Sequence, residues 1–184
     1  MMKAIIEYYY PEDGQLRRSL ISHSENVRKK ALAIAESSGL DLDLKLVSEG
    51  ALLHDIGIFK CHAPGIFCPG NAPYITHGII GAKLLREYAE QHDIDLERHA
   101  RICERHTGSG LSIEDIREQK LPLPERDYLP ETLEEKAVCL ADKFFSKSGD
   151  GTEKSLEEVR RGMKKFAPSA LERFESLCNL FKVK

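Results

Sequence analysis

Six histidine and aspartate side chains fall where helical spacing turns them toward an apolar interior. The first of them along the chain shares a stripe with Leu16, Leu20 and Val27, and the last lies between Val138 and Phe145. An isolated ionisable group in such a place costs several kcal/mol, so these residues need partners. The six are His23, the adjacent pair His54 and Asp55, then His77, His106 and Asp142.

Each of these residues taken alone has a simpler explanation, because a lone histidine on an apolar face is usually a hydrogen-bonded core residue. Together they satisfy one another only if they converge, and imidazoles with carboxylates converge most naturally on a metal ion. The five cysteines contain no C-x-x-C pair, which excludes a zinc finger. A mixed set of histidines and carboxylates with open positions suits iron, manganese or zinc used for catalysis.

The elements that must position these side chains are helices. Apolar residues recur at helical spacing in six stretches, and no segment alternates with a period of two. Gly39 ends the first stretch, Thr132-x-x-Glu135 is a capping box that opens the fifth, and Pro168 breaks the last. Residues 58–73 contain three prolines and form a loop of a length typical of binding loops. The predicted helices cover residues 11–38, 43–57, 74–91, 96–106, 132–147 and 156–181, with a short helix and an extended connection between 112 and 131.

This pattern predicts an all-α fold, in which one compact helical bundle holds a metal site between its helices. A chain of 184 residues with 41% hydrophobic content is long enough for one core. We therefore expect a single domain over residues 1–184, with a motif-bearing core at 15–148 and a C-terminal helical extension at 149–184. The apolar positions of the last helix would suit a homodimer.

Composition excludes several partners. The 27 Lys and Arg residues nearly balance the 30 Asp and Glu residues, for a net charge of −3, which argues against a protein that neutralises nucleic-acid phosphates. Tryptophan is absent and aromatic residues make up 7%, so a stacking platform for single strands is not expected. No apolar run approaches the roughly 20 residues that cross a bilayer, and the N-terminus lacks the apolar region of a secretory signal. Dispersed, odd-numbered cysteines suit a reducing compartment, and we expect a cytoplasmic location.

The order and spacing of the six residues resemble the HD superfamily of metal-dependent phosphohydrolases, of the HDIG type. The matching segments are HSENV, ALLHDIG, HGIIGA, ERHTG and KAVCLADK. The resemblance implies that one metal ion is bound by His23, His54, Asp55 and Asp142. It implies that His77 and His106 bind a second ion, which Asp55 bridges to the first. We therefore expect two divalent ions per chain, which would be iron, manganese or zinc, with magnesium or cobalt as further options.

The resemblance also implies the reaction. Metal-activated water would hydrolyse an ester or anhydride bond of a small phosphorylated substrate, a nucleotide or dinucleotide. The enzyme would act as a phosphomonoesterase, a phosphodiesterase or a nucleotide pyrophosphohydrolase. Two alternatives stay open at this point, because related folds include di-iron oxygenases and because the domain could be a regulatory module that binds metal without catalysis.

Other catalytic residues are harder to assign. Many family members read HDIGK, with a lysine that contacts phosphate, whereas Ile58 takes that place here and Lys60 follows two residues later. We predict Asp55, Lys60 and Arg18 as catalytic residues, and His62 as a proton donor to the leaving group.

Several further residues have two readings. Arg105 and Lys143 flank metal ligands, so each is either a phosphate contact or a surface residue. A soft-metal site formed by Cys61, His62 and Cys68 fits no standard zinc spacing and is a minor alternative. His92 and His99 lie outside the motifs and are expected on the surface.

Overall fold

The computed structural model describes residues 1–147 and 151–184. The predicted all-α class is confirmed, since the described residues form nine α-helices and one sheet of two very short strands. The helices are α1 (Met2–Tyr9), α2 (Gln15–Ser38), α3 (Leu44–Leu53), α4 (His77–His92), α5 (Glu97–Arg105), α6 (Ile113–Glu118), α7 (Leu133–Asp142), α8 (Leu156–Met163) and α9 (Pro168–Leu180).

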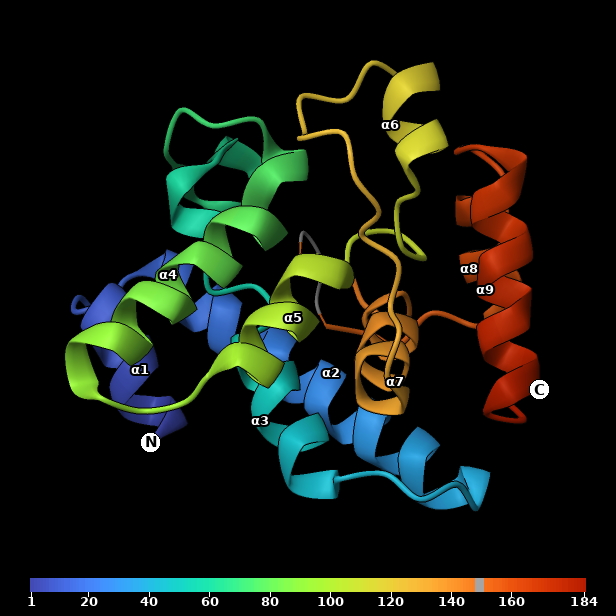
Figure 1. Cartoon of the computed structure of the whole chain (residues 1–184), viewed down its shortest axis with the longest axis horizontal. Coiled ribbons are helices and arrows are strands. Elements are labelled where there is room, and N and C mark those ends of the chain that lie inside the picture. The colour runs from blue at the N-terminus through green and yellow to red at the C-terminus, as the bar shows by residue number, and fades with distance from the viewer. Residues whose placement is uncertain (148–150) are drawn as a thin grey trace.

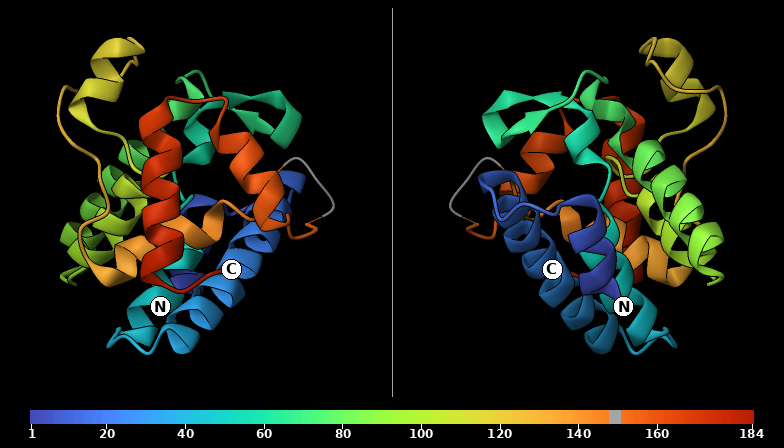
Figure 2. Two further views of the ribbon diagram at one scale, coloured as in Figure 1. Left: turned by 90° about the vertical axis from the view of Figure 1, so that its right-hand side faces the viewer. Right: turned by 90° about the vertical axis from the view of Figure 1, so that its left-hand side faces the viewer.

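The centre of the molecule is a bundle of α2, α3, α5 and α7, in which α2 packs on α3 and α7, and α3 packs on α5 (Figure 1). Helix α4 pairs with α5 and forms one side of the bundle. Helices α8 and α9 cover the opposite side, which faces the viewer in the left panel of Figure 2, and α6 stands out from the body there. No helix of the described residues is long and apolar enough to cross a bilayer.

Two clusters of buried apolar side chains hold the helices together. The N-terminal cluster joins α1 with α4, α5 and the start of α2, and the C-terminal cluster joins the rest of α2 with α3, α7, α8 and α9. Leu20 of α2 belongs to the first cluster and Val27 to the second. Along α3 and the turn after it, Ala51 lies in the C-terminal cluster and Leu53 in the N-terminal one. His23 and the residues after Leu53 therefore lie where the two clusters meet.

Several local predictions are confirmed. Gly39 ends α2 in the left-handed region at a φ of 73°. At the start of α7, the Thr132 hydroxyl accepts a hydrogen bond from the amide of Glu135 at 3.2 Å, and the Glu135 carboxylate accepts one from the amide of Thr132 at 3.3 Å. Both halves of the predicted capping box are thus formed.

The structure differs from the sequence-based expectation at several places, among them the start of α2 at Gln15 rather than residue 11 and the start of α4 at His77 rather than residue 74. Helix α1 was not predicted, yet Ile5 and Ile6 are buried and the hydroxyl of Tyr10 donates to the carbonyl of Ile56 at 2.9 Å. Helix α3 ends at Leu53 rather than at residue 57. Helix α7 ends at Asp142 rather than at residue 147.

The predicted loop after α3 is partly ordered by local hydrogen bonds. It contains two turns of 3-10 helix (Ile58–Lys60 and Pro64–Ile66) and an antiparallel pair of strands, β1 (His62–Ala63) and β2 (Cys68–Pro69), and a further 3-10 turn (Tyr74–Thr76) leads into α4. Gly57 anchors its start, because a Cβ atom there would lie 2.5 Å from the backbone nitrogen of Gly81 on α4. Only glycine permits this approach, which brings the end of α3 against the start of α4.

Candidate metal centre

The six candidate ligands are all buried and come from five different helical segments. One lies in the middle of α2, where the two apolar clusters meet. The others lie at helix ends, where the chain direction changes and side chains from separate helices can meet. These positions are His23 within α2, His54 and Asp55 directly after α3, His77 as the first residue of α4, His106 directly after α5, and Asp142 as the last residue of α7.

The first group of converging atoms comprises His23, His54, Asp55 and Asp142. Nε2 of His23 lies 2.9 Å from Oδ1 of Asp142 and 3.3 Å from Nε2 of His54. Oδ2 of Asp55 lies 3.3 Å from Nε2 of His23 and 3.1 Å from Nε2 of His54. Four potential ligand atoms thus surround one point.

The second group comprises Asp55, His77 and His106. The two Nε2 atoms lie 3.0 Å apart, and each lies within 3.5 Å of Oδ1 of Asp55. Asp55 therefore directs Oδ2 to the first group and Oδ1 to the second. A carboxylate so placed is able to bridge two ions.

Backbone carbonyls orient three of the four imidazoles. Nδ1 of His54 lies 2.6 Å from the carbonyl oxygen of Ala51, Nδ1 of His77 lies 2.6 Å from that of Tyr74, and Nδ1 of His106 lies 2.7 Å from that of Cys103. A carbonyl oxygen accepts a hydrogen bond only from an N–H group, so Nδ1 carries a proton in each of these rings, and Nε2 of a neutral ring presents its lone pair to the cluster.

These lone pairs give a physical test of whether the residues fit metal ions. Two imidazole lone pairs that face each other at 3.0 Å, as in His77 and His106, repel unless a proton or a cation lies between them. Ligands on one ion with bonds of about 2.1 Å are separated by about 3.0 to 3.4 Å in octahedral or tetrahedral shells. The two Nε2 pairs, at 3.0 and 3.3 Å, agree with that separation. The residues fit divalent metal ions.

Electrostatics favour the metal-binding form of the carboxylates. Although burial opposes ionisation, the positive charges of His54 and Lys147 hold the pKa of Asp55 well below its usual range. Lys143 and Lys147 have the same effect on the pKa of Asp142, again against burial. Burial also opposes protonation of His54, but the two carboxylates raise its pKa to about 9. Both carboxylates are therefore ionised at neutral pH.

The second pair of imidazoles is electrically different. Burial lowers the pKa of His77 to about 3, and the adjacent His106 adds to the effect. Burial likewise lowers the pKa of His106. Both rings are therefore neutral at pH 7, which is the form that binds a metal ion.

Two lysines lie directly against the carboxylates. Nζ of Lys147 is 2.7 Å from Oδ2 of Asp55, and Nζ of Lys143 is 2.7 Å from Oδ2 of Asp142. Their side chains are 14% and 8% exposed, so the surface reading of Lys143 is wrong. The sequence did not indicate Lys147 as part of the site, because a helix that continued to residue 147 would have turned this side chain away from the ligands. Since α7 ends at Asp142, the chain turns back and brings Lys147 to the cluster.

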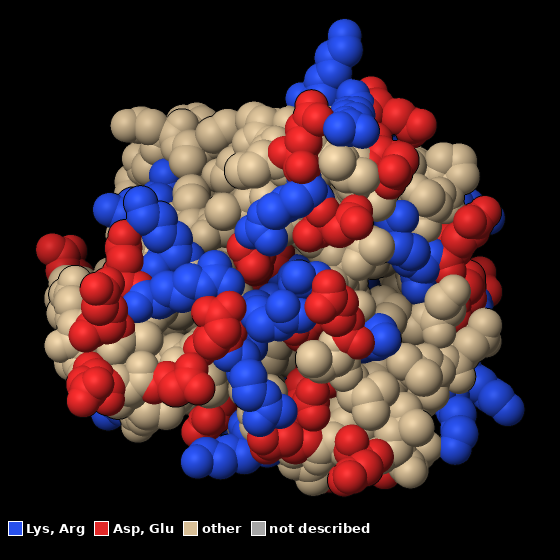
Figure 3. Space-filling model, viewed as in Figure 1, with Lys and Arg blue, Asp and Glu red and all other residues tan. Residues whose placement is uncertain are grey.

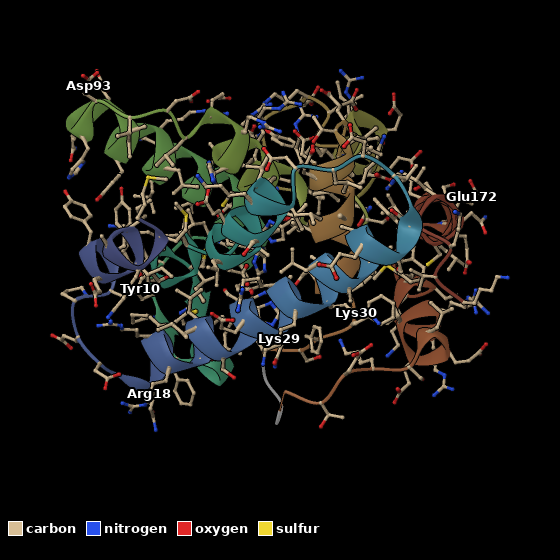
Figure 4. All side chains as sticks on the ribbon, turned by 90° about the horizontal axis from the view of Figure 1, so that it is seen from below. Tyr10, Arg18, Lys29, Lys30, Asp93 and Glu172 are labelled. Atoms are coloured by element: carbon tan, nitrogen blue, oxygen red, sulfur yellow. The ribbon has the colours of Figure 1, made fainter. Side chains whose placement is uncertain are left out.

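Two cavities reach the cluster. One has a volume of about 420 Å³ and is bounded at the cluster by His77, His106 and Asp142, together with both lysines. The other, of about 340 Å³, is lined by His23 and Lys147 and by Arg18. Arg18 is near the N-terminal end of α2, at the edge of the molecule in Figure 4, where it donates to the carbonyl oxygen of Asp13 at 2.7 Å.

The two other predicted catalytic residues do not reach the cluster. His62 is exposed on β1, and Lys60 is exposed with Nζ 5.0 Å from the ring centre of Phe59. Among the described residues that line the two cavities, neither is present. Their catalytic roles stay predictions, without support from this geometry.

The remaining candidates have structural partners. Arg105 is buried and donates to the carbonyl of Leu129 and to Glu131, at 2.5 and 2.8 Å. Figure 3 shows acidic and basic side chains interspersed on one face of the molecule, without a large area of one sign. His99 is not a surface residue, since its side chain is 10% exposed and its Nε2 lies 3.1 Å from Glu49, whereas His92 is exposed as expected.

The soft-metal alternative finds no support within the described residues. Cys61 and Cys68 are buried, while the histidine between them is exposed. The two groups described above are those in which ligand atoms come close enough to share an ion, and neither includes a cysteine.

Comparison with known proteins identifies the family. The HD domain family matches residues 20–146, which is more than half of the chain and includes all six side chains of the cluster. The chain belongs to the HD domain family, and the family prediction from the spacing of histidines and aspartates is confirmed.

Curated relatives are similar over parts of their length. A tRNA (cytidine(56)-2'-O)-methyltransferase of Picrophilus torridus is 42% identical over 127 residues, which are 69% of this chain and 31% of that protein. The protein of the same name from Thermoplasma volcanium is 38% identical over 158 residues, which are 86% of this chain and 40% of that one. An uncharacterised protein of Methanocaldococcus jannaschii is 40% identical over 132 residues, which are 66% of this chain and 68% of the relative. The chain thus spans less than half the length of the two methyltransferases.

Solved structures agree on the fold. The HD domain of the L. monocytogenes phosphodiesterase PgpH aligns with a TM-score of 0.51 at 18% identity, covering 98% of this chain and 95% of that one. The same domain in complex with cyclic-di-AMP aligns with a TM-score of 0.50 at 17% identity, covering 98% of this chain and 94% of that one. At this identity the likeness establishes the helical fold.

Proposed function

We propose that this protein is a metal-dependent phosphohydrolase with two divalent ions per chain. The observation that carries the proposal is the placement of Asp55, whose two oxygens face two separate imidazole pairs. His23, His54 and Asp142 would hold one ion, His77 and His106 the other, and Asp55 both. Iron, manganese and zinc suit this donor set, with magnesium and cobalt as alternatives.

When bound, the ions would activate water and neutralise charge that develops on a phosphoryl group. The chain's own residues would position the substrate. With cations on the two carboxylates, Lys143 and Lys147 would no longer be needed as their counter-charges, and from the wall of the larger cavity both could bind phosphate oxygens. Arg18, which lines the smaller cavity, is a third phosphate contact in this proposal.

The proposed substrate is a phosphate ester or anhydride of a nucleotide. Cationic side chains beside a cavity of about 420 Å³ support a small anionic ligand. The complex of the PgpH domain with cyclic-di-AMP is a nucleotide complex on the same fold. Methyl transfer is not part of the proposed function, because this chain spans only 31% and 40% of the length of the two methyltransferases. A reducing, cytoplasmic location is also proposed, from five unpaired cysteines that are all buried.

A phosphate-release assay tests the function. The full chain, loaded separately with Mn²⁺, Fe²⁺, Co²⁺ and Zn²⁺, is assayed on nucleoside phosphates, p-nitrophenyl phosphate and bis-p-nitrophenyl phosphate. We expect hydrolysis that depends on metal and that is lost in Asp55→Asn. His99→Gln is the matched control, since His99 is a buried histidine paired with a carboxylate outside the cluster.

Two outcomes would contradict the proposal. Consumption of dioxygen by the iron-loaded protein without phosphate release would favour an oxygenase. Full metal occupancy with no hydrolysis of any substrate would favour a regulatory module.

A further inference from the structure

The larger of the two cavities extends well beyond the metal cluster. Its near end is bounded by metal-ligand candidates and by Lys143 and Lys147. Its far end lies between the segment that follows α5 and the two C-terminal helices. The volume of about 420 Å³ is in the range of small-molecule sites, at the lower end of that range. The cavity therefore has room for one compact group in addition to a phosphate.

The far end of this cavity is mostly apolar. Leu111 and Leu121 line it from the segment after α5, and Met163 and Phe166 line it from α8 and the turn that follows. Phe166 is 61% exposed, so its ring lies at the rim with little protein packed against it. An exposed aromatic ring beside an apolar cavity is well placed to stack on a planar ligand.

One neutral polar side chain at this end is open to a ligand. The amide of Gln119 lines the cavity and makes no hydrogen bond within the described residues, whereas the hydroxyl of Thr107 lies at the near end, where a Cβ atom on Gly78 would be 3.2 Å from it. By contrast, the carboxylate of Asp115 accepts from Ser169 at 2.8 Å and from Arg173 at 2.5 Å and is paired, although Nε of that arginine is buried without a hydrogen-bond partner. The neutral polar group available at this end is thus the amide of Gln119, which offers both a donor and an acceptor.

We propose that this cavity binds one nucleoside of the substrate, with the phosphate at the two lysines and the base between Phe166 and the leucines. The proposal rests on the proposed phosphohydrolase function and specifies which part of the substrate is read and by which residues. A nucleobase is apolar on its faces and polar along its edge, which matches a stacking ring and a free amide. A sugar phosphate has no aromatic face to stack on Phe166, and a lipid phosphate has no polar edge to bind the amide of Gln119.

The residues that would select the base come partly from outside the family match. Met163, Phe166 and Arg173 lie beyond residue 146, where the match to the HD domain family ends. The C-terminal helices would therefore determine which nucleotide is bound, while the metal cluster determines the reaction.

Equilibrium binding tests the proposal directly. The Mn²⁺-loaded full chain is titrated calorimetrically with AMP, GMP, CMP and UMP, and with ribose 5-phosphate and phenyl phosphate as probes that lack a base. We expect the best-bound nucleotide to bind at least about tenfold more tightly than ribose 5-phosphate, which has no ring to stack, and more tightly than phenyl phosphate, whose ring can stack but has no polar edge for Gln119. Equal affinity for a nucleotide and for either probe would overturn the proposal.

Two variants and a control assign the residues. Phe166→Ala should weaken binding of the best nucleotide about tenfold and leave ribose 5-phosphate unchanged. Gln119→Ala should change the ranking of the four nucleotides. Leu180→Ala, a partly exposed apolar residue at the end of α9 outside this cavity, should change neither. If Phe166→Ala weakens both ligands equally or neither of them, the ring does not contact the base.

Failure of this site and failure of the enzyme give different results. Tight nucleotide binding without phosphate release from any substrate would reject the hydrolase and keep the nucleoside site. Hydrolysis of nucleotides and of ribose 5-phosphate with equal KM would reject the nucleoside site and keep the hydrolase.

Discussion

The metal cluster and the far end of the larger cavity are neighbours but are built in opposite ways. All six cluster side chains are buried, three of the four imidazoles are oriented by a backbone carbonyl, and all lie within the family match. The far end combines half-buried leucines with an exposed phenylalanine, and part of it lies outside the match. A site that places charges needs rigid supports, whereas a site that selects by shape can use a few contacts at the rim. The following predictions test this division of roles.

The largest expected effect is that of Asp55→Asn. Its two oxygens face the two groups, so the change removes the one negative charge that both ions would share. We expect activity to fall by more than the roughly 10- to 100-fold typical of residues that only support ligands. Elemental analysis should show both ions depleted, whereas His77→Ala should deplete one. If Asp55→Asn kept both ions and its turnover, Asp55 would not be the bridge.

Removal of the metal should destabilise the chain without unfolding it. The ligands lie on helical segments that pack into both apolar clusters, and bound ions add stability by mass action, about 4 kcal/mol at a thousandfold excess over the dissociation constant. For a chain of this size that corresponds to a fall in Tm of about 8 to 16 °C on chelation. Lys143 and Lys147 supply counter-charges in the metal-free state, so far-UV circular dichroism should remain helical. Asp55→Asn is the control, and its Tm should fall less on chelation than that of the unchanged protein. An unchanged Tm after verified removal would mean that these side chains do not bind metal.

Lys147→Met separates the role of this lysine from that of the ligands. Nζ lies 2.7 Å from Oδ2 of Asp55 and competes with a metal ion for the same oxygen. Its removal should therefore tighten metal binding several-fold, while KM for a phosphate substrate rises about tenfold through the lost contact. Metal titration and steady-state kinetics measure the two effects separately. If the role of Lys147 were purely structural, its removal would weaken both metal binding and substrate binding.

The smallest effect is expected at the far end of the cavity. Arg173→Met removes hydrogen bonds to Asp115 and to the carbonyl of Gly110, which hold the segment after α5 against α9. We expect KM to rise a few-fold, kcat and metal content to stay unchanged, and the free energy of unfolding to fall by about 1 to 3 kcal/mol. Denaturant titration measures the last of these. A large loss of kcat would show that the two regions do not have separate roles.

Much of the cluster was predictable from sequence because each ligand interrupts a helical apolar stripe. His23, for example, follows Leu20 and precedes Val27 at the spacing of one helix face. The capping box at Thr132 and the stop at Gly39 depend on neighbours within four residues, and both were predicted. Local interactions of this kind are visible in the sequence itself.

Features that depend on distant contacts were not predictable. Helix α1 has only eight residues, which is too short to be stable alone, and it forms because Ile5 and Ile6 pack on other helices. Lys147 reaches Asp55 only because α7 ends five residues earlier. His99 is buried and pairs with Glu49 of α3, and the spacing of residues along the chain does not indicate this contact. The far end of the cavity likewise arises from segments about 50 residues apart.

The position of His23 at the junction of the two apolar clusters has a consequence for amide exchange. Because α2 contributes Leu20 to one cluster and Val27 to the other, separating the clusters would pull the ligands apart. With metal bound, both halves should therefore open together, and slow amides on α4 and α9 should exchange with one common free energy. Without metal, that constraint is lost and the two halves become separate cooperative units. The histidine on α2 thus makes a single exchanging unit out of two cores.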